Sequence, residues 1–229
     1  LGQNVNSYKD GKINFPKLFK KVDQIPGDYW LTFGTSHPKD MSDELIKAMG
    51  SALHLTPYIN LPIQSGNNDI LQKMNRRYTV AHYIGLVKKI RKAVPGIAVS
   101  TDIIVGFPGE TKQQFNDSAK VMRELKFDMV YLAKYSPRAG TVAASMKNNI
   151  SLDEKKRRER GLNEILKKTA LEKNNVFLGK AVEVLVDEYK EGHCFGRTKH
   201  FKNIKFKSET NLIGQIVLVK VNRSYPWGL

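Results

Sequence analysis

The segment with the clearest capacity for chemistry is a glycine-rich stretch after an apolar run, STDIIVGFPGET at Ser100–Thr111. Glycine at a strand end has no side chain, so a planar ligand can approach the backbone closely. Thr111 and Gln114 form a capping box, and the free N–H groups at a helix start favour an anion or a carbonyl oxygen. The segment therefore predicts a ligand site between a strand and a helix. A tight strand-to-helix turn without a ligand is the alternative.

Cysteine and histidine give little support for a metal or thiol site. Cys194 is the single cysteine, which excludes an internal disulfide and a cysteine-based zinc or iron–sulfur site within this sequence, and we interpret it as a packing residue. His37 and His54 have no His, Cys or carboxylate partner at ligand spacing. We therefore assign no metal ligand and no catalytic side chain. We expect a substrate-side or structural role for His37 and a surface position for His54.

Alternating strands and helices must position the glycine-rich segment. Five strand-like runs are Leu1–Val5, Tyr29–Phe33, Pro57–Pro62, Ile97–Val105 and Met129–Lys134. Between them, capping signals at Ser42, Thr79 and Thr111 predict helix starts. Repeated strand–helix units predict a parallel sheet with binding residues at the carboxyl ends of its strands. Five strands are too few to close an eight-stranded barrel, so we predict an open, incomplete TIM-like α/β barrel over residues 1–174.

The last part of the chain changes to an all-β pattern. Ser151 and Glu154 form a second capping box before a charged helix through about Asn174, which we expect to lie on the surface as a connector. After Gly179, short runs alternate apolar and polar residues and are separated by turn residues. This pattern predicts a small all-β, OB-like barrel over residues 175–229.

The composition favours a polyanionic partner. Lysine and arginine number 38 against 22 aspartates and glutamates, a formal charge of +16 that is spread along the chain. A lysine-rich composition that only keeps the protein soluble is the alternative. The sequence has no run of about 18 apolar residues and no signal peptide, so we expect a cytoplasmic protein without a membrane partner.

Ordered segments of the chain resemble the radical S-adenosylmethionine (SAM) enzymes. They are Leu1–Tyr8, Leu61–Gly66 with Met74–Thr79, Ser100–Thr111 and Tyr135–Thr141. The resemblance implies SAM contacts at the strand ends. The implied contacts are Gln3 and Asn4 at the amino group, Gln64 and Ser65 at the ribose, Arg76 at the carboxylate, Asp102, Ile103 and Gly106 in the adenine segment, and Ser136 where the last strand closes over the cofactor.

Within that superfamily the chain resembles the methylthiotransferases. The strings at Gly2–Tyr8 and Thr35–Pro38 are similar to the branch that acts on adenosine 37 of tRNA, although Asn60 stands where the family has His, and Ala139 and Val142 where it has Pro. The family's Cys-x-x-x-Cys-x-x-Cys loop would lie just before the first residue. We therefore expect a partial core that cannot hold the iron–sulfur cluster or turn over by itself.

Residues 175–229 resemble a TRAM domain, the small RNA-binding barrel of these enzymes. Gly179–Lys180, Gly196–Thr198 and Leu212–Gly214 fit its pattern. The resemblance implies a basic surface that grips the RNA backbone by charge and bases by stacking. The RNA-binding residues that we expect there are Arg197, Lys199, Lys202 and Lys205. A structural barrel whose lysines only solvate it is the alternative.

The resemblance implies a tRNA-modifying enzyme that uses SAM and 4Fe–4S clusters. It would methylthiolate C2 of N6-isopentenyladenosine at position 37 in the anticodon loop, as a monomer supplied by an electron donor. Two alternatives stay open. One is a tRNA-binding module without catalysis, and the other is a methylthiotransferase of a sister branch that acts on threonylcarbamoyl-adenosine or on a ribosomal protein.

Overall fold

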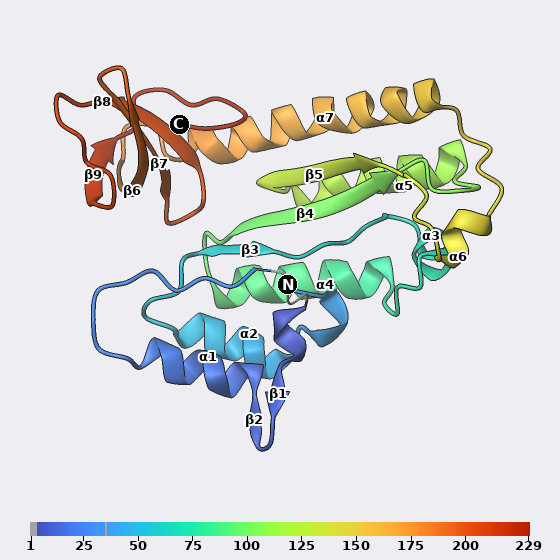
Figure 1. Ribbon diagram of the computed structural model, residues 1–229, viewed down its shortest axis with the longest axis horizontal. Helices are drawn as coiled ribbons and strands as arrows, with labels where there is room; N and C mark the ends of the chain where they lie inside the picture. Colours follow the sequence, from blue (N-terminus) through green and yellow to red (C-terminus); the bar gives the residue numbers. More distant parts are fainter. Residues whose placement is uncertain (1–3, 35) are drawn as a thin grey trace.

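A three-stranded parallel sheet organises the first part of the chain in the computed structural model, which describes residues 4–34 and 36–229 (Figure 1). β4 (Ala98–Val105) lies between β3 (Tyr58–Asn60) and β5 (Met129–Lys134). Both pairings are parallel, so the carboxyl ends of the three strands meet at one edge. Three of the predicted strands are therefore confirmed.

Two predicted strands differ from expectation. The run at Tyr29–Phe33 makes only one parallel bridge, between Leu31 and Leu55. The opening run falls partly on residues 1–3, outside the described residues, and continues as a 3-10 turn, η1 (Val5–Ser7). The sheet that can be described is accordingly smaller than the predicted incomplete barrel.

Capped helices pack around this sheet. The other elements of this part are the hairpin β1 (Lys9–Asp10) and β2 (Ile13–Asn14), the 3-10 turn η2 (Pro38–Asp40), and the helices α1 (Phe15–Asp23), α2 (Asp43–Ser51), α3 (Asn68–Lys73), α4 (Val80–Ala93), α5 (Lys112–Leu125), α6 (Val142–Ser145) and α7 (Leu152–Asn175). The predicted caps are confirmed, because Ser42, Thr79 and Thr111 each accept the N–H of the third residue on. No helix in the described ranges is both long and apolar enough to cross a bilayer.

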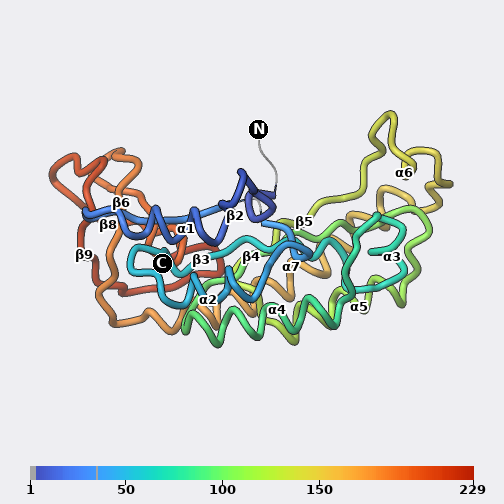
Figure 2. The backbone as a smooth tube through the Cα atoms, turned by 90° about the horizontal axis from the view of Figure 1, so that it is seen from below, coloured from blue at the N-terminus to red at the C-terminus, as the bar shows by residue number. Residues whose placement is uncertain are grey.

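The two faces of the parallel sheet differ in chemistry. Ile59, Val99 and Ile103 point into the main hydrophobic core, where α4, α5 and α7 cover the sheet (Figures 1 and 2). The opposite face carries Tyr58, Asn60, Ser100, Asp102 and Tyr131, and Tyr131 is 52% exposed. Parallel sheets are normally covered on both faces, so a polar and partly open face marks a surface that receives something else.

The long helix α7 contributes to the core, contrary to the predicted surface connector. Leu162, Leu166 and Ala170 recur at four-residue spacing and are fully buried in the main hydrophobic core. Lys155 and Arg158, nearer the helix start, are only 5% exposed each. The abundance of charged residues concealed this apolar stripe in the sequence.

The chain after α7 forms an antiparallel sheet, as its period-two pattern predicts. β6 (Ala181–Lys190), β7 (His193–Thr198), β8 (Asn203–Lys207) and β9 (Ile216–Lys220) are arranged in the order β8-β7-β6-β9. β8 and β9 stand at the two edges of this sheet, so closure into an OB-like barrel is not confirmed. A small separate core around Val184 lies beneath it.

The loop between β7 and β8 fastens this second sheet to the first one. The ring of Phe201 stacks on that of Tyr58, with centroids 4.3 Å apart. The adjacent Lys202 places its Nζ 2.7 Å from Oδ1 of Asp128. Tyr58 begins β3 and Asp128 precedes β5, so the second sheet is held at the amino-terminal ends of the parallel strands, away from their carboxyl edge.

Candidate cofactor site and RNA surface

The segments predicted to bind SAM meet at the carboxyl edge of the parallel sheet. The Gln64 N–H donates to the Asp102 carbonyl (2.8 Å), and the Ile104 N–H donates to the Gln64 carbonyl (3.0 Å). The Tyr135 N–H donates to the last carbonyl of β4 (2.9 Å), which brings the segment of Ser136 to the same edge. These segments therefore lie side by side, at the end of the sheet where ligands of parallel sheets bind.

Unusual backbone conformations gather at this edge. Asn4, Gln64 and Asn75 have positive φ angles of 66°, 70° and 54°. A left-handed conformation costs a residue with a side chain roughly 1–2 kcal/mol, and such strain concentrates at functional sites. Of these three residues, Gln64 is the most strained, because asparagine adopts a left-handed conformation more readily than glutamine does.

Asn4 presents an unsatisfied acceptor at the edge. Its amide Nδ2 donates to Oδ2 of Asp40 (2.6 Å), while its Oδ1 is buried and has no hydrogen-bond partner among the described residues. An amide oxygen in this state is suited to accept from an ammonium group. The predicted role of Asn4 at the SAM amino group fits this orphaned oxygen. Gln3, its predicted companion, lies outside the described residues.

Arg76 contacts a histidine at the same edge. Its Nη1 lies 3.0 Å from Nε2 of His37. Burial, and then the charge of Arg76, lower the pKa of His37, so the ring is neutral near neutral pH. The guanidinium therefore faces a neutral partner and keeps its charge available for an anion such as a carboxylate. Sequence reasoning left the role of His37 open and missed this pair.

Gly106 is required by a contact inside the protein. Its φ is +72°, and a Cβ at this position would lie 2.4 Å from Cγ of Lys155. Nζ of Lys155 continues to the Tyr135 carbonyl, to which it donates (3.1 Å). The start of α7 thus covers Gly106 and joins it to the end of β5. This contact supports the alternative reading of the glycine as a turn residue.

A buried ion pair locks the glycine-rich loop to α7. Oε2 of Glu110 accepts from the Gly106 N–H (2.7 Å) and from Nη1 of Arg158 (2.6 Å). The same Nη1 also donates to the Glu110 carbonyl (3.0 Å). Burial raises the pKa of Glu110. Glu110 belongs to the glycine-rich segment Ser100–Thr111. No sequence pattern marks Arg158, because it lies in a helix whose many charged residues predict an exposed position.

The other predicted SAM residues divide into exposed and buried side chains. Ser65 is fully buried, and its Oγ accepts from the Asn67 N–H (3.3 Å); Ile103 lies in the core. Because the side chains of Ser65 and Ile103 are buried, these residues can contact SAM only through their main-chain atoms. Asp102 is half-buried beside Asn60, whose Nδ2 donates to it (3.2 Å), and burial raises the pKa of Asp102. Ser136 is exposed.

Two of the four predicted RNA-binding residues form short ion pairs with carboxylates of the chain, one buried and one exposed. Lys202 is 7% exposed and is paired with the nearly buried Asp128, so it does not lie on the open surface that we expected of an RNA contact. Lys199 is paired with Glu183 at 2.5 Å. Sequence alone gave no sign of these partners, since Asp128 lies 74 residues away.

The remaining two lie on the open face of the second sheet. Arg197 and Lys205 are exposed, and Arg197 makes a partly exposed pair with Asp187 (3.3 Å). Nζ of Lys205 lies 5.3 Å from the ring centre of Phe195, on the neighbouring strand β7. A lysine beside an aromatic ring combines a phosphate contact with a stacking surface, which is the combination used for single-stranded nucleic acid.

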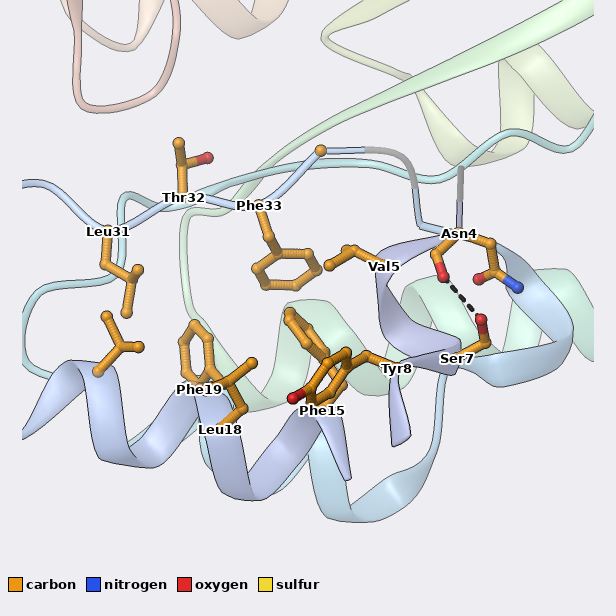
Figure 3. A pocket seen from close by; sticks show the side chains of 12 residues that line it. Asn4, Val5, Ser7, Tyr8, Phe15, Leu18, Phe19, Leu31, Thr32 and Phe33 are labelled. Atoms are coloured by element: carbon orange, nitrogen blue, oxygen red, sulfur yellow. Dashed lines mark hydrogen bonds between the residues drawn. The ribbon is translucent and has the colours of Figure 1, made fainter. Parts of the chain in front are cut away.

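An apolar cavity of about 580 Å³ lies beside the Asn4 edge (Figure 3). It separates α1 from residues 31–34, with Phe15, Phe19 and Phe33 on its walls and Asn4 at one end. Nothing in the sequence reasoning predicted it, because its walls come from segments that are distant in the chain.

The described residues do not fit an iron–sulfur cluster. Across residues 4–34 and 36–229 there is no group of three or more His, Cys, Asp or Glu side chains that would hold a metal ion. Cys194 is buried in β7, as expected of a packing residue. The clearest sign of a ligand site among the described residues is the orphaned oxygen of Asn4.

Known proteins match the chain as follows. The family model of the radical SAM superfamily matches residues 1–122. The tRNA-2-methylthio-N(6)-dimethylallyladenosine synthase of Acetivibrio thermocellus is 43% identical over 100% of this chain and 49% of its own length. The synthase of the same name from Endomicrobium trichonymphae is 41% identical over 98% of this chain and 54% of its own length. The chain thus spans about half the length of these curated relatives.

Among solved structures, the radical SAM enzyme coproporphyrinogen III oxidase of Escherichia coli matches 58% of this chain and 31% of its own. It is 17% identical, with a TM-score of 0.49.

Proposed function

Because this chain belongs to the radical SAM superfamily, we propose that it is the SAM- and tRNA-binding part of a tRNA methylthiotransferase. The proposed reaction places a methylthio group on C2 of N6-dimethylallyladenosine at position 37 of the anticodon loop. The support is the similarity, 43% identity over the whole chain, to a protein named for that product. We further propose a cytoplasmic monomer that works with a separate electron donor.

The observation that carries the proposal is the orphaned oxygen of Asn4. It is a buried acceptor, at the carboxyl edge of the sheet, in a contact series that reaches Arg76 through Asp40, Lys39 and His37. An amino acid moiety would satisfy both ends, its ammonium at Asn4 and its carboxylate at Arg76. In this arrangement Gln64 and the main chain around Gly106 take the nucleoside part of SAM.

SAM bound at this edge would supply the radical chemistry of the superfamily. The described residues contribute no ligand set for an iron–sulfur cluster. Their contribution is to orient SAM, through the charge of Arg76 and the loop held by Glu110 and Arg158, and to exclude water.

We also propose that residues 175–229 form the RNA-binding unit, with Arg197 and Lys205 on its contact face. Both side chains are exposed, and Phe195 lies on β7 with Arg197 and pairs with Lys205 of β8. Lys199 remains a weaker candidate, because its ion pair with Glu183 is shorter than that of Arg197 with Asp187 and its side chain is less exposed.

Two measurements test the proposal. First, the full-length gene that contains this sequence is expressed in cells that lack the corresponding synthase, and tRNA nucleosides are analysed by mass spectrometry. The expected result is the return of the 2-methylthio nucleoside, and its absence despite accumulated protein favours the non-catalytic binding module.

Second, binding of SAM to the 229-residue chain is followed by NMR with isotope-labelled SAM. We expect a dissociation constant on the order of 1 mM or higher, because the described residues hold no iron that could coordinate SAM. Asn4→Leu should abolish this binding, whereas Asn222→Leu, at an exposed position, should not. If Asn4→Leu leaves the affinity for SAM unchanged, the assignment of Asn4 to the SAM site is wrong.

A further inference from the structure

A second, polar pocket opens on the outer side of the carboxyl edge. It has a volume of about 360 Å³ and is lined by Asn4, His37, Lys39, Asn75 and Arg77. Asn75 has a left-handed backbone, and the two arginines that follow it have different surroundings. Arg76 is half-buried against His37, whereas Arg77 is exposed and lines the pocket.

The charges around this pocket are poorly compensated. Asp40 is the acidic residue beside it, and its carboxylate accepts from Asn4 at 2.6 Å and makes a long ion pair of 3.8 Å with Lys39. Arg77 enters no ion pair of the described residues. Burial, and then the charge of Arg76, lower the pKa of His37; Asp40 opposes this shift and Lys39 adds to it.

We propose that Lys39 and Arg77 form a clamp for one phosphodiester group of the RNA substrate. This inference rests on the proposed function, since the substrate nucleotide must reach the same edge of the sheet. Contacts of basic side chains with phosphates fix the register of a nucleic acid without reading its sequence. The clamp would hold the backbone next to the modified nucleotide while the nucleotide itself enters the site.

A phosphodiester suits this pocket better than the carboxylate of SAM. Arg76 contacts His37 and is not among the residues that line the pocket, and one carboxylate is matched by one guanidinium. Lys39 and Arg77 lie further out, with about half of the Lys39 side chain exposed, at 48%. A phosphodiester continues as a chain in two directions, so it requires a pocket that is open to solvent.

The test combines substitutions in the protein with substitutions in the RNA. A short RNA stem-loop with the anticodon sequence is prepared in several versions. Each version carries a methylphosphonate at one position, which removes the charge of that phosphate. Affinities are measured for the wild-type chain and for the Lys39→Ala/Arg77→Ala variant. Lys92→Ala/Arg123→Ala is the matched control, since both residues are exposed on helices α4 and α5.

We expect one methylphosphonate position to weaken wild-type binding by about tenfold, as for a charge-assisted hydrogen bond. The Lys39→Ala/Arg77→Ala variant should bind unmodified RNA about tenfold more weakly and lose nothing further at that position. Its salt slope should fall by about 0.7–0.9, the value for one neutralised phosphate. The control variant should keep the tenfold effect of the modified RNA.

The outcomes separate the clamp from the wider proposal. Equal losses in both variants, or a modified position that still weakens the Lys39→Ala/Arg77→Ala variant, overturn the clamp but leave tRNA binding intact. A variant that loses SAM binding and keeps RNA affinity assigns the pocket to the SAM carboxylate. If the wild-type chain does not bind the stem-loop, the proposed tRNA function itself fails.

Discussion

Replacing Gly106 by alanine should destabilise the protein for two separate reasons. The φ of +72° is left-handed, which costs a residue with a Cβ roughly 1–2 kcal/mol. The added Cβ would lie 2.4 Å from Cγ of Lys155, and overpacking of this kind costs typically about 1–3 kcal/mol. The sum predicts that Gly106→Ala lowers the free energy of unfolding by about 2–5 kcal/mol.

Urea unfolding of four variants separates the two contributions. Gly96→Ala is the matched control, because Gly96 has a φ of +80° and open space where its Cβ would be. It should show the conformational cost alone. Lys155→Ala removes the atoms that the new Cβ meets, so Gly106→Ala should cost about 1–3 kcal/mol less in that background.

Two results would refute this reasoning. One is a Gly106→Ala loss no larger than that of Gly96→Ala, which means that Lys155 moves away without cost. The other is an unchanged loss when Lys155 is alanine. If Gly106→Ala instead abolishes SAM binding while stability is preserved, the glycine serves the adenine and the contact with α7 is incidental.

Three further predictions concern charged groups. Lys202→Met should lower the free energy of unfolding by about 3 kcal/mol, because it leaves Asp128 buried without its partner. Hydrogen bonds from Arg157 and Arg158 lower the pKa of Glu154 to about 2. The stability that ionised Glu154 contributes is therefore fully present above the usual pKa of a glutamate and is lost as the pH falls through about 2. Glu154→Gln should therefore flatten the pH dependence of stability between about pH 5 and 2. Arg76→Ala should raise the pKa of His37, measured by NMR titration, because it removes a neighbouring positive charge.

Controls for these three changes lie close to each site. Lys207→Met, at an exposed position on β8, should change stability by no more than about 0.5 kcal/mol. A comparable loss in both lysine variants would contradict the buried pair. Parallel acid-unfolding curves for wild type and Glu154→Gln would contradict the second prediction. A His37 pKa that responds to Arg77→Ala but not to Arg76→Ala would contradict the third.

The parts of the fold that follow from local signals were predictable. The helix after Thr79 and the capping box at Thr111 and Gln114 are confirmed, because caps are set by residues within one turn. β4 was predictable because a buried parallel strand reads as an apolar run. β5 is also confirmed, although Val130 is its one buried residue. The run at Tyr29–Phe33 has a similar pattern but makes only one bridge, since its pairing depends on distant segments.

The candidate site was predictable only as a set of segments. The sequence indicated which stretches lie at the carboxyl edge, and Gln64 and Tyr135 do lie beside β4. It did not indicate which side chains face the edge, so Ser65 and Ile103 were included although both are buried. Contacts between distant segments, such as Lys155 over Gly106, depend on how α7 packs and leave no local pattern.

The length of α7 sets a minimum reach for any ligand that uses both ends of the molecule. Its first turns cover the loop of Gly106, and Asn174 near its end donates to the Tyr225 carbonyl below the second sheet. Its 24 residues span about 36 Å. A free nucleoside is too small to bridge that distance. Affinity for RNA should rise in a step once the strand is long enough to touch both ends.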